Sequence, residues 1–155
     1  MLRKASDLIN LPVINLTSGS QVAKVKDLVL NADDDSLLGF ICDNNTYLPL
    51  KAIKTLGKDA VVVEVDNIDG ILEPFKTPIN APLFLPEYLI GTPIITENGK
   101  NIGTVGDILI AEDTCKIEGY EISDGLLKDL VAGRSIISIP QVITYGEDAV
   151  VIKEQ

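Results

Sequence analysis

Side chains that could do chemistry are few in this chain of 155 residues. It contains no histidine, so the commonest general base and the commonest metal ligand are both missing. Ser–His and Cys–His nucleophile pairs are excluded for the same reason. The only two cysteines, Cys42 and Cys115, lie far apart in the sequence. They are typical of small buried side chains in a reducing compartment.

The acidic run Asp33-Asp34-Asp35 suggests calcium binding at first sight. An EF-hand loop that began at Asp33 would need glycine at its sixth position and glutamate at its twelfth. Leu38 and Asn44 stand at those places. We therefore expect an exposed hairpin turn here, with no metal ion.

Two Gly-Lys pairs, at 57–58 and 99–100, resemble the end of a phosphate-binding loop. Such a loop also needs a glycine five residues before its second glycine, and Ser or Thr after the lysine. Ala52 and Ile94 stand at the glycine position, and neither lysine is followed by a hydroxyl residue. The sequence thus predicts no catalytic residue, no cofactor and no metal ligand, and we expect that the protein is not an enzyme.

The net charge of the chain limits the classes of partner that it can bind. The formal net charge is −10, with −3 in residues 1–80 and −7 in residues 81–155. Nucleic-acid binding requires clustered Lys and Arg, and an anionic membrane surface repels an acidic protein. No stretch approaches the ~18 apolar residues of a membrane span, and the N-terminus does not read as a signal peptide. We expect a soluble cytoplasmic protein without nucleic-acid binding or membrane insertion.

The chain contains an internal repeat, which decides the fold. Residues 8–30 and 89–110 both open with Leu-Ile, reach a proline three residues later, and pass through a glycine turn into Val-x-Asp. The match continues with Leu48-Pro49 against Ile139-Pro140, and with Gly-x-Asp-Ala-Val-Val at 57–62 and 146–151. Cys115 falls opposite Asp35, so the cysteines are not equivalent. The second copy has an insertion near residues 125–134.

Each copy predicts the same order of short elements. The class is mainly β, with two tandem small β-barrels that each carry short helical turns. We divide the chain into a first repeat at 1–67, a linker at 68–87 and a second repeat at 88–155. The first copy predicts a helical turn at 6–9, strands at 12–16, 21–31, 37–43 and 60–66, and a short strand that ends at Leu48. The second copy predicts a helical turn at 87–90, strands at 93–96, 101–111, 116–123 and 148–153, and a short strand that ends at Ile139.

These repeated residues resemble the PRC-barrel family. The resemblance lies in the opening Leu-Ile-x-x-Pro, the glycine turn before Val-x-Asp, the glycine followed by an aromatic residue (Gly39-Phe40, Gly119-Tyr120) and the closing Gly-x-Asp-Ala-Val-Val. It implies small barrels that serve as interaction modules. Members include the cytoplasmic part of the photosynthetic reaction centre H subunit and the C-terminal domain of a ribosome maturation factor. The family has no active site whose residues could be transferred to this chain.

The linker is the first candidate for an interaction surface. Its prolines recur every four residues from Pro74 to Pro86, and proline favours extended chain. A flexible spacer would be polar, whereas this one contains Phe75, Phe84 and Leu85. The linker either straps the two barrels together or forms a groove for a partner or a homodimer.

The insertion in the second copy is the other candidate. Asp124 can cap a short helix that Gly133 ends. Leu126, Leu127, Leu130 and Val131 then share one face of that helix. Each such side chain contributes about 1.5–3 kcal/mol when buried. We expect this face to pack either on its own barrel or on a partner.

The leading hypothesis is a non-enzymatic adaptor that binds another protein, and the resemblance to the PRC-barrel family implies a role such as sporulation or the assembly of a larger complex. Two alternatives stay open: a protein that binds a small molecule or a metal ion, and a structural protein that assembles with itself.

Overall fold

The computed structural model describes residues 2–74, 83–84, 86–123 and 136–154. The chain splits into two compact units. One is Ala5–Leu85, which we call the first module. The other is Met1–Lys4 together with Pro86–Gln155, which we call the second module. Both consist mainly of β-strands, which confirms the predicted fold class.

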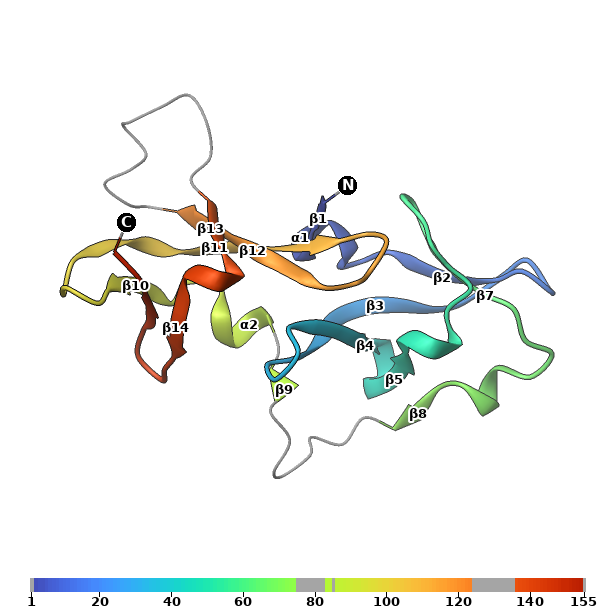
Figure 1. Cartoon of the computed structure of the whole chain (residues 1–155). Coiled ribbons are helices and arrows are strands. Elements are labelled where there is room, and N and C mark those ends of the chain that lie inside the picture. Colours follow the sequence, from blue (N-terminus) through green and yellow to red (C-terminus); the bar gives the residue numbers. More distant parts are fainter. Residues whose placement is uncertain (1, 75–82, 85, 124–135, 155) are drawn as a thin grey trace. The chain divides into compact units, whose positions relative to one another are not determined.

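The first module contains eight described strands: β2 (Pro12–Asn15), β3 (Ser20–Asn31), β4 (Ser36–Cys42), β5 (Thr46–Pro49), β6 (Thr55–Leu56), β7 (Val61–Val63), β8 (Glu73–Pro74) and β9 (Leu83–Phe84). Its helical turns are α1 (Ala5–Leu8), η1 (Asp43–Asn45), η2 (Leu50–Ala52) and η3 (Ile68–Gly70). The strand order is β6-β7-β2-β3-β4-β5-β8, and β9 also pairs with β3. The long strand β3 is thus central to the module, because it pairs with β2, β4 and β9 (Figure 1).

The second module contains seven described strands: β1 (Leu2–Lys4), β10 (Pro93–Thr96), β11 (Asn101–Ala111), β12 (Ile117–Ser123), β13 (Ile136–Ser138), β14 (Val142–Tyr145) and β15 (Val150–Ile152). Its helical turns are α2 (Pro86–Leu89) and η5 (Ile139–Gln141). The strand order is β13-β12-β11-β10-β15-β14, and β1 also pairs with β11. In both modules the only parallel pair is the equivalent one, β2 with β7 and β10 with β15, among the described strands.

Full closure into barrels, which the sequence predicted, is wrong for the described strands. The hydrogen-bonded order ends at β6 and β8 in the first module and at β13 and β14 in the second. The three-residue turn η5 alone separates β13 from β14, and the described pairing does not join these strands. A side-chain hydrogen bond between β12 and β14 links the sheet there instead of a backbone ladder.

The Val-x-Asp motif makes a β-bulge in each module. The pairing register shifts between Val25 and Asp27 and, in the second copy, between Val105 and Asp107. Each aspartate accepts a hydrogen bond from the backbone N–H of the next residue at 2.8 Å. A bulge bends its strand and increases the twist, so the repeated motif contributes to the bending of β3 and β11, together with a second register shift at Val29/Leu30 and Leu109/Ile110.

Aliphatic side chains fill the interior of each module, as the scarcity of aromatic residues predicts. Buried and more exposed residues alternate along the first part of β3 and β11, but the last part of each strand is buried without a break, at Leu28–Leu30 and Asp107–Ala111. The fully buried set in the first module includes Leu8, Val13, Val25, Leu28, Leu30, Phe40, Leu48 and Val61. In the second it includes Ile94, Val105, Ile108, Ile110, Tyr120, Ile137 and Val150.

The hairpin turns fall where the sequence placed them. Asp33 donates its backbone N–H to Asn31 Oδ1 at 2.9 Å, and Ser36 Oγ bonds Asp34 Oδ1 at 2.6 Å. Asp35 and Cys115 both adopt positive φ, 52° and 56°. These equivalent positions confirm that the acidic run is a turn, and that Cys115 occupies a turn position of the repeat.

Strand register corrects one detail of the repeat alignment. Leu48 pairs with Phe40, and Ile137 pairs with Tyr120 in the same place of the second module. Leu48 is therefore equivalent to Ile137, and the predicted match of Leu48-Pro49 with Ile139-Pro140 is wrong by two residues. The error came from matching the two prolines with each other. Pro49 precedes its helical turn, whereas Pro140 lies inside one.

The two strands that open the repeats, β1 and β9, were not predicted from the sequence. β1 pairs with β11 in the second module, through Leu2 with Ala111, Arg3 with Ile110 and Lys4 with Leu109. β9 pairs with β3 in the first module. Each module is thus completed by a strand that the sequence places in front of the other copy.

Among the described residues, no helix is long and apolar enough to cross a membrane.

Candidate interaction surface

Most of the interaction residues that the sequence predicted lie outside the described residues. This holds for the predicted helix, with Leu126, Leu127, Leu130 and Val131, and for Phe75 and Leu85 of the linker. Phe84 is part of β9, where its backbone pairs with Leu30. The contacts of these seven side chains stay a prediction.

The described part of the second module has exposed apolar side chains on its strands β13 and β14. Ile136 on β13 is 54% exposed, and Ile143 and Tyr145 on β14 are 47% and 38% exposed. The turn η5 connects the two strands. β14 ends the strand order, and in the described structure it pairs with β15 alone. We call Ile143, Tyr145 and the outer edge of β14 the β14 edge.

A pair of tyrosines anchors the β14 edge. The hydroxyls of Tyr120 and Tyr145 lie 2.7 Å apart, and their rings meet edge to face with centroids 6.0 Å apart. Tyr120 is buried, and a buried hydroxyl needs a hydrogen-bond partner. Phe40 and Leu56 occupy the equivalent positions of the first module. The hydroxyl contact is therefore specific to the second module, where it ties β14 to β12.

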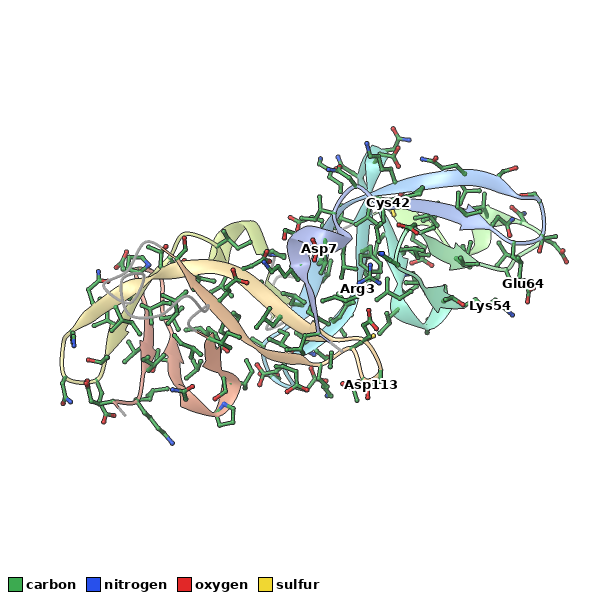
Figure 2. The ribbon with its side chains drawn as sticks, turned by 90° about the horizontal axis from the view of Figure 1, so that it is seen from above. Arg3, Asp7, Cys42, Lys54, Glu64 and Asp113 are labelled. Atoms are coloured by element: carbon green, nitrogen blue, oxygen red, sulfur yellow. The ribbon has the colours of Figure 1, made fainter. Side chains whose placement is uncertain are left out.

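In the first module, the equivalent edge carries a charged side chain that protects it from pairing with another chain. Thr55 pairs with Val62 as Thr144 pairs with Val151, so Lys54 is the equivalent of Ile143. Lys54 Nζ lies 3.3 Å from Glu64 Oε1, and Figure 2 shows the two side chains together. Lysine on an edge strand discourages pairing with another chain. At the same position the second module presents an exposed isoleucine.

Neither cysteine is set up as a nucleophile. Burial, with a smaller contribution from the charge of Asp43, raises the pKa of the Cys42 thiol to about 11. Burial, together with Asp113, also raises the pKa of Cys115. The reactive thiolate is disfavoured at both positions. Across residues 2–74, 83–84, 86–123 and 136–154, no three His, Cys, Asp or Glu side chains could hold a metal ion.

The raised pKa of Cys42 predicts a loss of stability in alkali. The folded state holds the thiol proton up to pH of about 11, whereas the unfolded chain releases it near 9. The stabilisation is therefore complete below pH 9 and is lost as the pH rises toward 11, at a cost on the order of 2 kcal/mol. Urea unfolding of the natural protein and of Cys42→Ala, each from pH 8 to 11, isolates this effect from other titrations. Parallel pH profiles for the two proteins would contradict it.

The fold and this surface define a class: a tandem pair of small, mainly β modules. The family model of the PRC-barrel domain matches the chain twice, over residues 2–69 and 84–155. The protein belongs to the PRC-barrel family, and contains two copies of its domain. A search of curated proteins finds no match to this sequence.

Proposed function

We propose that this protein is a non-enzymatic interaction module that binds another protein through the β14 edge. One observation carries the proposal: Ile143 is exposed on an edge strand, at the position where the first module has the ion-paired Lys54. Membership of the PRC-barrel family supports a module role of this general kind. The lack of histidine and the protonated thiols argue against nucleophilic catalysis.

An edge strand offers a direct binding mode. Its outward N–H and C=O groups can pair with an extended segment of a partner, while alternate side chains select the sequence. Ile143 and Tyr145 would supply that selection on the β14 edge. Exposed Glu147 and Asp148 follow in the next turn, and residues 81–155 carry a net charge of −7. We therefore expect a partner segment that combines apolar and basic residues.

The substitution Ile143→Lys tests binding at the β14 edge, because it introduces the residue type that the first module has at the equivalent position, Lys54. Because the side chain is exposed, we expect unfolding free energy to change by no more than about 0.5 kcal/mol. Binding should fall strongly, because the lysine removes apolar contact and repels a basic segment. The measurement is quantitative mass spectrometry of proteins retained from lysate by the natural chain and by the variant.

Leu16→Lys is the matched control. Leu16 is equally apolar and 53% exposed, but it lies in the first module, in the turn between β2 and β3. Partners of the β14 edge should be retained by this control and lost from Ile143→Lys. If both variants retain the same proteins as the natural chain, the β14 edge is not the binding site.

A further inference from the structure

The two leading strands have been exchanged between the copies. The family matches begin at residues 2 and 84, so by sequence β1 opens the first copy and β9 opens the second. In space β1 pairs with β11 of the second module, and β9 pairs with β3 of the first. The positions that receive them are equivalent, because Arg3 lies opposite Ile110 as Phe84 lies opposite Leu30.

Charge distinguishes the two receiving positions. Arg3, which is 9% exposed, lies with its Nε 3.7 Å from Glu112 Oε1. Lys4 Nζ lies 3.3 Å from Glu121 Oε2. At the places of Glu112 and Glu121 the first module has Ala32 and Ile41, which carry no charge.

The position beside β11 therefore matches the charge of the strand that it holds. The position beside β3 receives an apolar strand, Leu83-Phe84. The position beside β11 receives Leu2-Arg3-Lys4 and provides a carboxylate for each cation. A basic strand beside β3 would lose both ion pairs, and a largely buried arginine without its partner is destabilising. The two ion pairs therefore favour β1 beside β11 over β1 beside β3.

We propose that this edge of β11, along Leu109–Ala111, is a binding site for an apolar-Arg-Lys strand, and that the N-terminus of a second copy can fill it. Two chains would then exchange β1 and form a closed dimer. The strand β1 is three residues long, and the Lys4–Ala5 bond connects it to the first module. Every contact of β1 is kept in such a dimer, which is why exchange of an identical element is an inexpensive route to a two-fold assembly.

Mass action decides which form is populated. Within one chain, β1 is held near its site at a high effective concentration, commonly in the millimolar range. The monomer is therefore favoured in dilute solution, and the exchanged dimer increases with chain concentration. Release of β1 must precede exchange, so equilibration is fastest after partial unfolding and refolding.

Interchain disulfide formation tests the proposal, in full-length chains that carry Cys115→Ser. One chain carries Leu2→Cys and the other carries Ala111→Cys, since these residues are direct partners across the two strands. The two are mixed, refolded together over a range of concentrations and oxidised. We expect a cross-linked dimer that increases with concentration, and a matching dimer of the natural chain by light scattering. A chain with both cysteines should close an internal disulfide in dilute solution, which verifies that the geometry permits the bond.

Two further mixtures separate exchange from chance collision. Leu16→Cys replaces Leu2→Cys as an exposed control outside β1, and should give no concentration-dependent cross-link with Ala111→Cys. Adding Lys4→Glu to the Leu2→Cys chain should reduce the cross-link, and Glu121→Lys in its partner should restore it. The absence of the interchain bond, or its equal formation with Leu16→Cys, would overturn the proposal. Ile143→Lys should leave the cross-link unchanged, so this result is independent of partner binding at the β14 edge.

Discussion

Gly119→Ala is expected to destabilise the protein by about 3 kcal/mol or more, because it forces two strands apart. A Cβ atom at this position would overlap the carbonyl oxygen of Ile137 on the neighbouring strand, and would press on the backbone of Ser138. Both obstacles are main chain, so no flexible side chain can move aside, and overpacking of this kind must shift the strand. Chemical denaturation of the natural protein and of the variant measures the difference.

A second glycine, in the first module, should respond in the same way, and a third glycine provides a control. Gly39, the equivalent residue of the first module, meets the carbonyl oxygen of Leu48 in the same way, so Gly39→Ala should be similarly costly. At Gly70 an added Cβ would meet no atom within 4 Å, and the backbone there does not have a positive φ. Gly70→Ala should therefore change stability by less than about 0.5 kcal/mol. Equal stability of Gly119→Ala and Gly70→Ala would show that the strands beside Gly119 have room for a side chain.

Arg3→Glu is expected to have the second largest effect, a loss of about 2–4 kcal/mol. The arginine side chain is largely buried beside Glu112. Glu112 is 41% exposed, so the main cost comes from the new carboxylate at position 3, which takes a largely buried place without a cation beside it. Urea unfolding measures the loss. Hydrogen exchange at amides of β11 that β1 covers should increase at the same time, whereas the amide of Ala111 donates to the carbonyl oxygen of Lys116 and should change less.

A charge reversal separates the ion pair from general disruption. The double variant Arg3→Glu with Glu112→Arg should recover part of the lost stability, since the pair is restored with opposite polarity. Lys54→Glu is the matched control: it breaks the exposed pair with Glu64, and should cost less than about 1 kcal/mol. If Arg3→Glu and Lys54→Glu cost the same, burial of Arg3 does not contribute to how β1 is held.

Local patterns in the sequence were sufficient for the central strands. The strand predicted at 101–111 is confirmed by β11 (Asn101–Ala111), and that at 21–31 by β3, which begins one residue earlier. Alternation of apolar residues and a glycine turn are short-range signals, and the repeat presents them twice. Local patterns gave the wrong equivalence for Leu48, because the two repeats were matched there by their prolines. Pairing register depends on the facing strand and not on the prolines.

The sequence by itself determined the duplication, the β class, the turns and the absence of histidine chemistry, because these depend on residue types and their spacing along the chain. Only the tertiary structure decided which strand completes which module and which edge stays exposed. β1 is too short to be recognised locally, and its ion-pair partners, Glu112 and Glu121, lie more than a hundred residues away along the chain. The exposure of Ile143 likewise became visible only when strand pairing placed it at the position of Lys54. Both features depend on contacts between distant residues, which no periodicity in the sequence records.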